Sequence, residues 1–342
     1  MAELFADDAD VHTLGSQLGS SAMPHDLQSQ LQSALALPPL IGVTMFENFT
    51  HTQITVNGIA INLVYGGSGP PLLLLHGYPQ THVEWHKIAP TLAEQYTVVA
   101  PDLRGYGDSS KPPAPEGDLS VYCKRTTAQD QVEVMATLGF DSYHVVGHDR
   151  GCRVAHRMAL DHGERIKTLT SLDVAPSQAA FDNMDSQLSF AWFHWHLMRQ
   201  PSPLPETLIG NSAEVYLNFL LERWTAIDGA ITDEAHAEYL RCFLDPDTIR
   251  ATCLDYRGIE LDLQHDEVDR GRKLTCPVLV LWGSNMAKRP GWQTGAKLDM
   301  LSVWRDRAPN VRGKPLSCGH FLPEELPEET AAGILAFVAE FE

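Results

Sequence analysis

An aspartate flanked by glycines stands where an apolar run ends and a helical pattern begins. The segment VVGHDRG (145–151) has the form G-x-nucleophile-x-G, whose small residues permit a sharp turn that exposes a nucleophile at the edge of a sheet. A carboxylate attacks acyl carbon poorly, but it can displace a leaving group from an sp³ carbon and so form an alkyl ester. Water must then hydrolyse this ester at the aspartate carbonyl. We therefore interpret Asp149 as the nucleophile of a two-step displacement.

The partners of such a nucleophile follow it in the chain in the order acid, then histidine. Asp173 closes the apolar run TLTSLDV (168–174), and His320 lies in SCGHF (317–321), after the last strand-like run. We predict that His320 is the general base that removes a proton from the hydrolytic water. Asp173 is predicted to fix the tautomer of the imidazole.

Ester hydrolysis also needs hydrogen-bond donors for an oxyanion. The turn HGYP (76–79) follows an apolar run, at the place where such folds supply a backbone N–H. We expect the N–H groups of Tyr78 and of Arg150, the residue after the nucleophile, to form the oxyanion hole. A tight turn is the other interpretation of HGYP, and it is compatible with this role.

Arg150 and Arg153 are three residues apart at the start of the predicted helix, so they share one helix face beside Asp149. Two guanidinium groups there would bind a small carboxylate and keep Asp149 ionised. The alternative is that each arginine forms a salt bridge to a carboxylate of the protein. The formal net charge of −19 does not exclude an anionic substrate, because salt screens distant surface charge within about 10 Å.

Strand-like and helical patterns alternate around these residues. Alternating runs flank Asn57-Gly58, a strong hairpin signal. Buried strands are predicted at 72–77, 96–102, 143–149, 168–174 and 276–283, with a further strand at 310–316. Helices are predicted at about 125–138, from about 150, and at about 328–341. Strands that alternate with helices predict an α/β fold with a mostly parallel sheet covered on both faces.

The chain divides into three kinds of segment. Residues 1–45 are polar and are predicted to be an N-terminal extension outside the core, with one weakly helical stretch. Residues 46–175 and 271–342 carry the α/β pattern. Residues 176–270 are rich in Trp, His, Phe and Met and have helical periodicity, so we predict a helical cap over the carboxyl ends of the strands, where such sheets bind ligands.

Composition excludes several classes of partner. The net charge of −19 argues against nucleic acid, and no apolar run is long enough to span a membrane. The six cysteines form no C-x-x-C pair, and the N-terminus lacks the pattern of a secretory signal, so a cytoplasmic protein with reduced thiols is expected. His194 and His196 are two residues apart and would point away from each other on a helix, so we predict no metal site.

Several motifs together resemble the fluoroacetate (haloacetate) dehalogenases of the α/β-hydrolase superfamily. The resemblance covers about residues 48–342 and rests on HGYPQTHVEWHKIAP, PDLRGYGDSSKP, GHDRGCRVAHRMALDH, LDVAPS, FHWHLMRQPSPLPE, DYRGIELDLQHD and CGHFLPEELPEE. It implies an α/β-hydrolase fold with an inserted cap, and hydrolysis of small 2-haloacids through an aspartyl ester without a cofactor. It also implies a homodimer.

The resemblance assigns a role to each site residue. Asp149, Asp173 and His320 would be catalytic, and the two arginines would hold the substrate carboxylate. His194, Trp195 and Tyr256 would form the halide pocket. Fluoride is a poor and strongly hydrated leaving group, so three converging N–H and O–H donors suit it. Without the resemblance, the aromatic run AWFHWH (191–196) would be interpreted as the core of a cap helix.

Two other functions fit parts of this pattern. An epoxide hydrolase uses the same Asp-Asp-His machinery and protonates the leaving oxygen with cap tyrosines, for which Tyr216 and Tyr256 are candidates, but a neutral epoxide needs no paired arginines. A non-catalytic receptor would bind a small acid without turnover. His196 and the segment 285–297 depart from the dehalogenase pattern, which leaves the cavity shape and the preferred halogen open.

Overall fold

The computed structural model describes residues 45–285 and 298–342. The predicted N-terminal extension and nearly all of the unusual 285–297 segment lie outside the described residues. Within them the chain forms an eight-stranded sheet with the order β1-β2-β4-β3-β5-β6-β7-β8. The strands are β1 (Thr50–Val56), β2 (Ile59–Gly66), β3 (Pro71–Leu75), β4 (Thr97–Pro101), β5 (Tyr143–His148), β6 (Ile166–Leu172), β7 (Val278–Gly283) and β8 (Val311–Leu316).

The sheet begins with the predicted hairpin. β1 and β2 pair antiparallel with Val56 opposite Ile59, and the turn residues Asn57 and Gly58 both have positive φ, 50° and 76°, as a two-residue turn that matches strand twist requires. β2 also pairs antiparallel with β4. All pairs from β4 to β8 are parallel. The predicted mostly parallel α/β sheet is confirmed.

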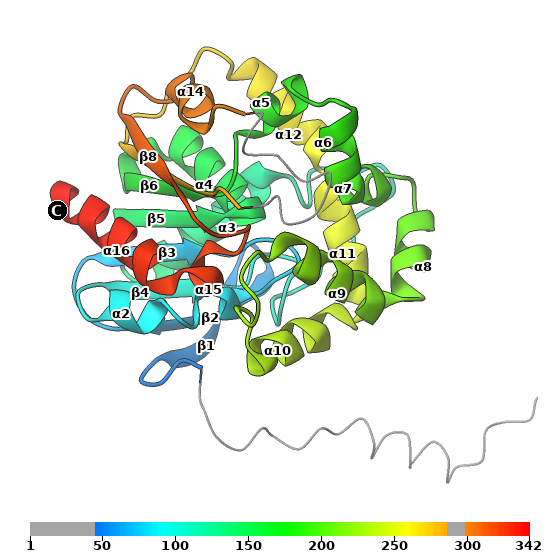
Figure 1. Cartoon of the computed structure of the whole chain (residues 1–342), viewed down its shortest axis with the longest axis horizontal. Coiled ribbons are helices and arrows are strands. Elements are labelled where there is room, and N and C mark those ends of the chain that lie inside the picture. Colours follow the sequence, from blue (N-terminus) through cyan, green and yellow to red (C-terminus); the bar gives the residue numbers. More distant parts are fainter. Residues whose placement is uncertain (1–44, 286–297) are drawn as a thin grey trace, which may run out of the picture. The chain divides into compact units, whose positions relative to one another are not determined.

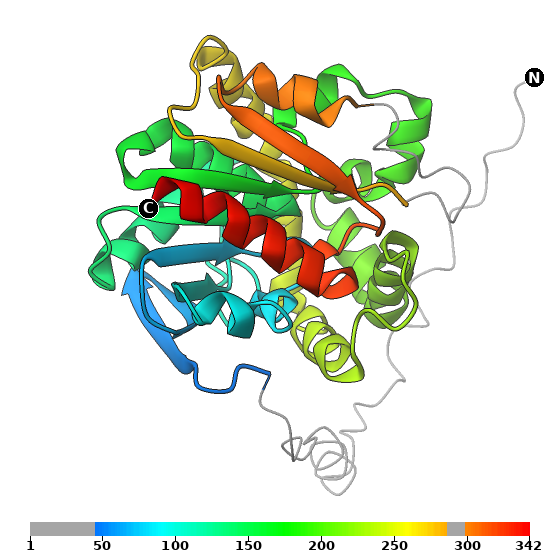
Figure 2. The same ribbon diagram turned by 60° about the vertical axis from the view of Figure 1, so that its left-hand side comes forward.

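Helices cover both faces of the sheet. α2 (Ala89–Ala93) and α16 (Pro327–Val338) lie on one face, and α3 (Lys124–Thr137) and α4 (Asp149–Asp161) lie on the other (Figure 1, Figure 2). The remaining short elements of the core are η1 (His82–Trp85), η2 (Gly163–Arg165), α14 (Met300–Arg305), α15 (Leu322–Glu325) and η4 (Ala339–Phe341). Because both faces are covered, every residue of the central strand β5 is buried.

A run of helices separates β6 from β7. It comprises α5 (Ser177–Asp182), α6 (Ser186–Ala191), α7 (Phe193–Met198), α8 (Leu204–Gly210), α9 (Ala213–Trp224), α10 (Asp233–Phe243), α11 (Pro246–Arg257) and α12 (Ile259–Val268). Figure 1 shows these helices together beyond the carboxyl ends of the strands. The exact division into core and cap stays a prediction. In the described part of the chain, no helix has the length and apolarity to cross a membrane.

Candidate active site

Asp149 lies in the tight turn that joins β5 to α4. Its φ is +43°, a left-handed conformation that costs a non-glycine residue about 1–3 kcal/mol and persists only where the surroundings enforce it. The flanking glycines are required by close packing: a Cβ on Gly151 would lie 2.0 Å from the carbonyl oxygen of Leu75, and one on Gly147 would lie 2.5 Å from the Cα of Cys152. The predicted tight turn is therefore present, with the carboxylate of Asp149 at the end of the central strand.

Asp173 and His320 meet at the same edge of the sheet. Asp173 directly follows β6, and its Oδ2 lies 2.7 Å from Nδ1 of His320. The other carboxylate oxygen of Asp173 accepts the N–H of Gly283 at 2.9 Å, which fixes the acid between two strand ends. With Nδ1 bound to Asp173, Nε2 of His320 is the nitrogen left for a substrate or a water. This is the tautomer that a general base needs.

A buried carboxylate that the sequence reasoning missed shapes the loop around His320. Glu325 accepts backbone N–H groups from Gly319 at 2.9 Å, Phe321 at 3.0 Å, Ala226 at 2.8 Å and Ile227 at 3.0 Å. Two of these donors flank His320 and two follow α9. One carboxylate thus joins the loop that carries the histidine to the helical insertion.

The carboxylate of Asp149 is held in its ionised form. Burial raises its pKa, but the charges of His320, His148 and Arg153 and the N–H of Tyr78 together hold the pKa below its usual value. Oδ1 accepts the backbone N–H of Tyr78 at 3.0 Å. Tyr78 therefore already contacts the oxygen that would become the oxyanion. The second predicted donor, the N–H of Arg150, is one of the first four of α4, which have no acceptor inside the helix; its role stays a prediction.

The guanidinium group of Arg150 forms hydrogen bonds to Asp255 along one of its edges. Its Nε and Nη2 donate to the carboxylate and the backbone oxygen of Asp255, each at 2.8 Å, so the alternative of a salt bridge is realised for this side. Nη1 is buried and has no hydrogen-bond partner among the described residues. The guanidinium carbon lies 4.5 Å from the ring centre of Tyr256. One N–H edge is thus fixed by Asp255 and another is left for a ligand.

Arg153 lies one helical turn further along α4. Its Nη1 donates to Oγ of Ser177 at 2.9 Å, and its guanidinium carbon lies 4.7 Å from the ring centre of Trp195. Its Nε is buried and lacks a partner in the described part of the chain. Leaving a buried charged donor unsatisfied is costly, so the two arginines together present donors that suit an anion.

The three residues predicted for the halide pocket converge from two helices. His194 and Trp195 lie on α7 and Tyr256 lies on α11; the ring centres of His194 and Tyr256 are 5.5 Å apart, and that of Trp195 is 6.5 Å from each. Burial lowers the pKa of His194 to about 3 and raises that of Tyr256 well above 10. Both are therefore neutral at pH 7. Nδ1 of His194 and the hydroxyl of Tyr256 have no partner among the described residues.

Two other residues of this region, His196 and Tyr216, lie in different surroundings. His196 is exposed, while His194 is buried, which matches the opposite directions expected two residues apart on a helix. Tyr216 is the other candidate acid for an epoxide, and its ring centre lies 6.1 Å from that of Phe243. Burial is the largest cause of the raised pKa of Tyr78, and the nearby Tyr216 raises that pKa further. Tyr216 therefore lies close to Tyr78 and Tyr256.

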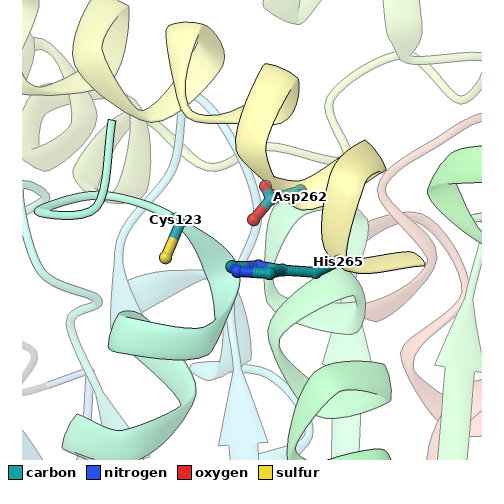
Figure 3. Close-up of side chains that lie close together, drawn as sticks. All are labelled: Cys123, Asp262 and His265. Atoms are coloured by element: carbon teal, nitrogen blue, oxygen red, sulfur yellow. The ribbon is translucent and has the colours of Figure 1, made fainter. Parts of the chain in front are cut away.

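A group of three potential metal ligands lies where α12 meets the start of α3 (Figure 3). The ligating atoms of Cys123, Asp262 and His265 are all within 4.8 Å of one another. However, Oδ1 of Asp262 accepts the N–H of Lys124, the first residue of α3, at 2.7 Å, so the carboxylate serves as a helix cap. Burial and the nearby charge of Arg125 lower the pKa of His265, and that positive charge opposes a cation. These contacts join α12 to α3 and do not describe a metal centre.

Comparison with known families agrees with the fold. A family model described as the alpha/beta hydrolase fold matches residues 70–322, and the chain belongs to this family. The predicted α/β-hydrolase fold is thus confirmed.

Within the family, the similar proteins include a dehalogenase and epoxide hydrolases. A fluoroacetate dehalogenase from Burkholderia sp is 42% identical over 299 residues, which cover 86% of this chain and 96% of that protein. A soluble epoxide hydrolase from Corynebacterium sp. (strain C12) is 35% identical over 303 residues, 86% of this chain and 99% of that protein. The solved structure of a putative alpha/beta hydrolase from Nostoc sp PCC 7120 is 53% identical with a TM-score of 0.81, over 85% of this chain and 98% of that one. The resemblance to the dehalogenases is confirmed, and a hydrolytic function is supported.

Proposed function

We propose that the protein hydrolyses small 2-haloacids, such as fluoroacetate, to the 2-hydroxy acid and halide through an ester on Asp149. The observation that carries this proposal is a pair of buried arginine donors, Nη1 of Arg150 and Nε of Arg153, that have no partner among the described residues. They lie one turn apart on the helix that starts at the nucleophile. A substrate with a carboxylate one bond from the reacting carbon would satisfy both donors while its α-carbon faces Asp149.

The first chemical step is a displacement at carbon. An oxygen of Asp149 attacks the α-carbon, the carbon–halogen bond breaks, and the halide leaves with the bonding electrons. Negative charge develops on the halogen, and the N–H and O–H donors of His194, Trp195 and Tyr256 would stabilise it. The neutral state of His194 and Tyr256 suits this role, because each then offers a hydrogen without losing it.

The second step is hydrolysis of the ester. Water attacks the carboxyl carbon of Asp149 and gives its proton to Nε2 of His320. The negative charge moves to the oxygen that receives the N–H of Tyr78. The tetrahedral intermediate collapses, the leaving alkoxide oxygen takes the proton from the imidazolium of His320, and the 2-hydroxy acid leaves. The carboxyl group of Asp149 then releases its remaining proton to solvent and is a carboxylate again. Asp173 stabilises the imidazolium that forms in between.

An epoxide hydrolase is the second candidate, and one observation favours it. Nδ1 of His194 and the hydroxyl of Tyr256, which have no partner within residues 45–285 and 298–342, would suit an epoxide oxygen as well as a halide. An epoxide hydrolase is also among the relatives. A neutral epoxide would, however, leave both arginine donors buried and unsatisfied, a cost of about 1–3 kcal/mol or more for each. A non-catalytic acid receptor is the third candidate and would bind haloacetate without releasing halide.

Halide release separates these candidates. The purified protein is expected to release fluoride and glycolate in equal amounts from fluoroacetate, and to leave styrene oxide unchanged. Asp149→Asn, checked by mass for deamidation, is the matched control and is expected to release none. Chloride release from chloroacetate without fluoride release would keep the reaction class and exclude C–F cleavage. Diol from styrene oxide with no halide would establish the epoxide hydrolase, and binding without turnover would establish the receptor. The homodimer and the cytoplasmic location stay predictions.

A further inference from the structure

His148, which precedes the nucleophile, has an oxygen atom facing each of its two ring nitrogens. Nε2 lies 2.8 Å from the carbonyl oxygen of His320, and Nδ1 lies 3.0 Å from Oε1 of Glu84. The side chains of His148 and Glu84 are both fully buried. A neutral imidazole has one N–H and one lone pair, and a carbonyl oxygen has no proton to give. Nε2 therefore carries a hydrogen. Nδ1 and Oε1 of Glu84 face each other at ion-pair distance without the alignment of a hydrogen bond. A second proton lies on one of these two groups, because a lone pair and a carboxylate would otherwise repel each other.

The charges around His148 place that second proton on the imidazole. Carboxylates face the ring from three elements: Glu84 on η1, Asp149 on α4 and Asp173 after β6, with the ring of His320 at 4.4 Å. Burial lowers the pKa of His148, but these carboxylates raise it to about 9.

A second buried carboxyl nearby, Glu324, is neutral. Burial and the charge of Glu84 raise its pKa to about 8. It is bound by Gln80 and by the hydroxyl of Tyr239 at 3.0 Å. The negative charge thus stays on Glu84, next to His148.

The Glu84–His148 pair also connects the parts of the proposed active site. The second oxygen of Glu84 accepts the N–H of Gly77 at 3.0 Å, in the turn whose next residue, Tyr78, donates to Asp149. Nε2 of His148 holds the backbone of His320. The pair is therefore attached to the oxyanion turn, the nucleophile and the general base.

We propose that Glu84 and His148 are positioning residues, and that His148 is a fixed positive charge behind Asp149 that favours hydrolysis of the ester over its formation. This inference rests on the proposed two-step reaction. During ester formation Asp149 loses negative charge, which a neighbouring cation disfavours. During hydrolysis negative charge returns to the same carboxyl group, and the cation stabilises it without reorganisation.

The first experiment reads the charge directly and does not depend on turnover. Histidine side chains labelled with ¹⁵N are titrated by NMR, and His148→Gln assigns the signal. Wild-type His148 is expected to remain protonated through pH 8. In Glu84→Gln, which keeps the shape and removes the charge, its midpoint is expected to fall by at least about one pH unit. A neutral His148 at pH 7 in the wild-type protein would overturn the proposal.

The second experiment separates the two steps at pH 8. Quenched single turnovers with fluoroacetate measure ester formation by fluoride and ester hydrolysis by glycolate. In Glu84→Gln the hydrolysis rate is expected to fall at least about tenfold relative to the formation rate, less than the 10²–10³-fold loss of a direct oxyanion donor. Glu260→Gln, at an exposed position on α12, is the control and is expected to keep the wild-type ratio.

Each outcome decides a different point. His148→Gln removes the proposed positive charge itself and replaces Glu84→Gln if that variant does not fold. An unchanged ratio of the two rates in a folded variant would overturn the positioning role even with His148 protonated. A wild-type protein that releases no fluoride would instead refute the proposed function, and the titration would still decide the charge of His148.

Discussion

Asp255 accepts two hydrogen bonds of 2.8 Å from one edge of the Arg150 guanidinium, one at its carboxylate and one at its backbone oxygen. Lys124 and the hydroxyl of Tyr106 bind the same carboxylate. Asp255 therefore forms ion pairs with two buried cations, Lys124 and Arg150, and sets the direction in which Nη1 of Arg150 points. A guanidinium group that is oriented before the substrate arrives loses little conformational entropy on binding.

Removing a hydrogen bond to Asp255, or its negative charge, is expected to weaken substrate binding. Tyr106→Phe removes one hydrogen bond to the carboxylate and should raise KM for fluoroacetate about twofold to fivefold, in line with a net worth of about 0.5–1.5 kcal/mol. Asp255→Asn should raise KM more than tenfold and destabilise the fold by about 3–5 kcal/mol, because it leaves buried charges unpaired.

Kinetics and thermal unfolding of each variant check this expectation. Glu260→Gln is the control, since its ion pair with Arg199 is exposed and should contribute little. Unchanged KM in a folded Asp255→Asn protein would show that Arg150 does not depend on Asp255 for its orientation.

Replacing the general base is expected to trap the intermediate. His320→Asn cannot take a proton from water, so ester formation should continue while hydrolysis stops, and the protein should gain the mass of one carboxymethyl group per site. Intact-mass spectrometry after exposure to fluoroacetate measures this gain. The exposed His196, changed to Asn, is the control. Normal turnover of His320→Asn with no added mass would place the base elsewhere.

The buried carboxyl of Glu324 should make stability depend on pH. Its pKa in the folded protein is raised from 4.5 to about 8. Its contribution to the free energy of unfolding is therefore fully present below pH 4.5, and it is lost as the pH rises from 4.5 through 8. Glutamine does not ionise. The free energy of unfolding of Glu324→Gln relative to wild type should therefore increase between pH 5 and pH 8 by up to about 3 kcal/mol.

Urea denaturation at several pH values measures this difference. Glu260→Gln, at an exposed position, should differ from wild type by a constant amount over the same range. Parallel stability curves for Glu324→Gln and wild type would mean that Glu324 is ionised at neutral pH and that the buried network holds its charge differently.

Local sequence patterns were sufficient to predict the hairpin, the strands of the sheet and the edge at which the candidate site lies. The Asn57-Gly58 turn and the strand that ends at His148 follow from residue types close together in the chain. The order of Asp149, Asp173 and His320 was enough to expect them at one sheet edge, because parallel strands bring their carboxyl ends together.

The network behind the site could not be predicted in the same way. Glu84 contacts His148 across 64 residues, and Asp255 contacts Arg150 across 105. Nothing in the sequence next to either carboxylate marks it as buried, since such residues are usually exposed. The salt-bridge alternative for Arg150 was foreseen, but the sharing of its donors between Asp255 and the site depends on packing between α4 and α11.

The most direct test of the proposed aspartyl ester is a single turnover of fluoroacetate, with enzyme in excess, in water labelled with ¹⁸O. If Asp149 displaces the fluoride, the hydroxyl oxygen of glycolate comes from the unlabelled carboxylate, and ¹⁸O appears in the peptide that contains Asp149. Glycolate that carries ¹⁸O after one turnover, with an unlabelled Asp149 peptide, would mean that water attacks the substrate directly and would contradict the account.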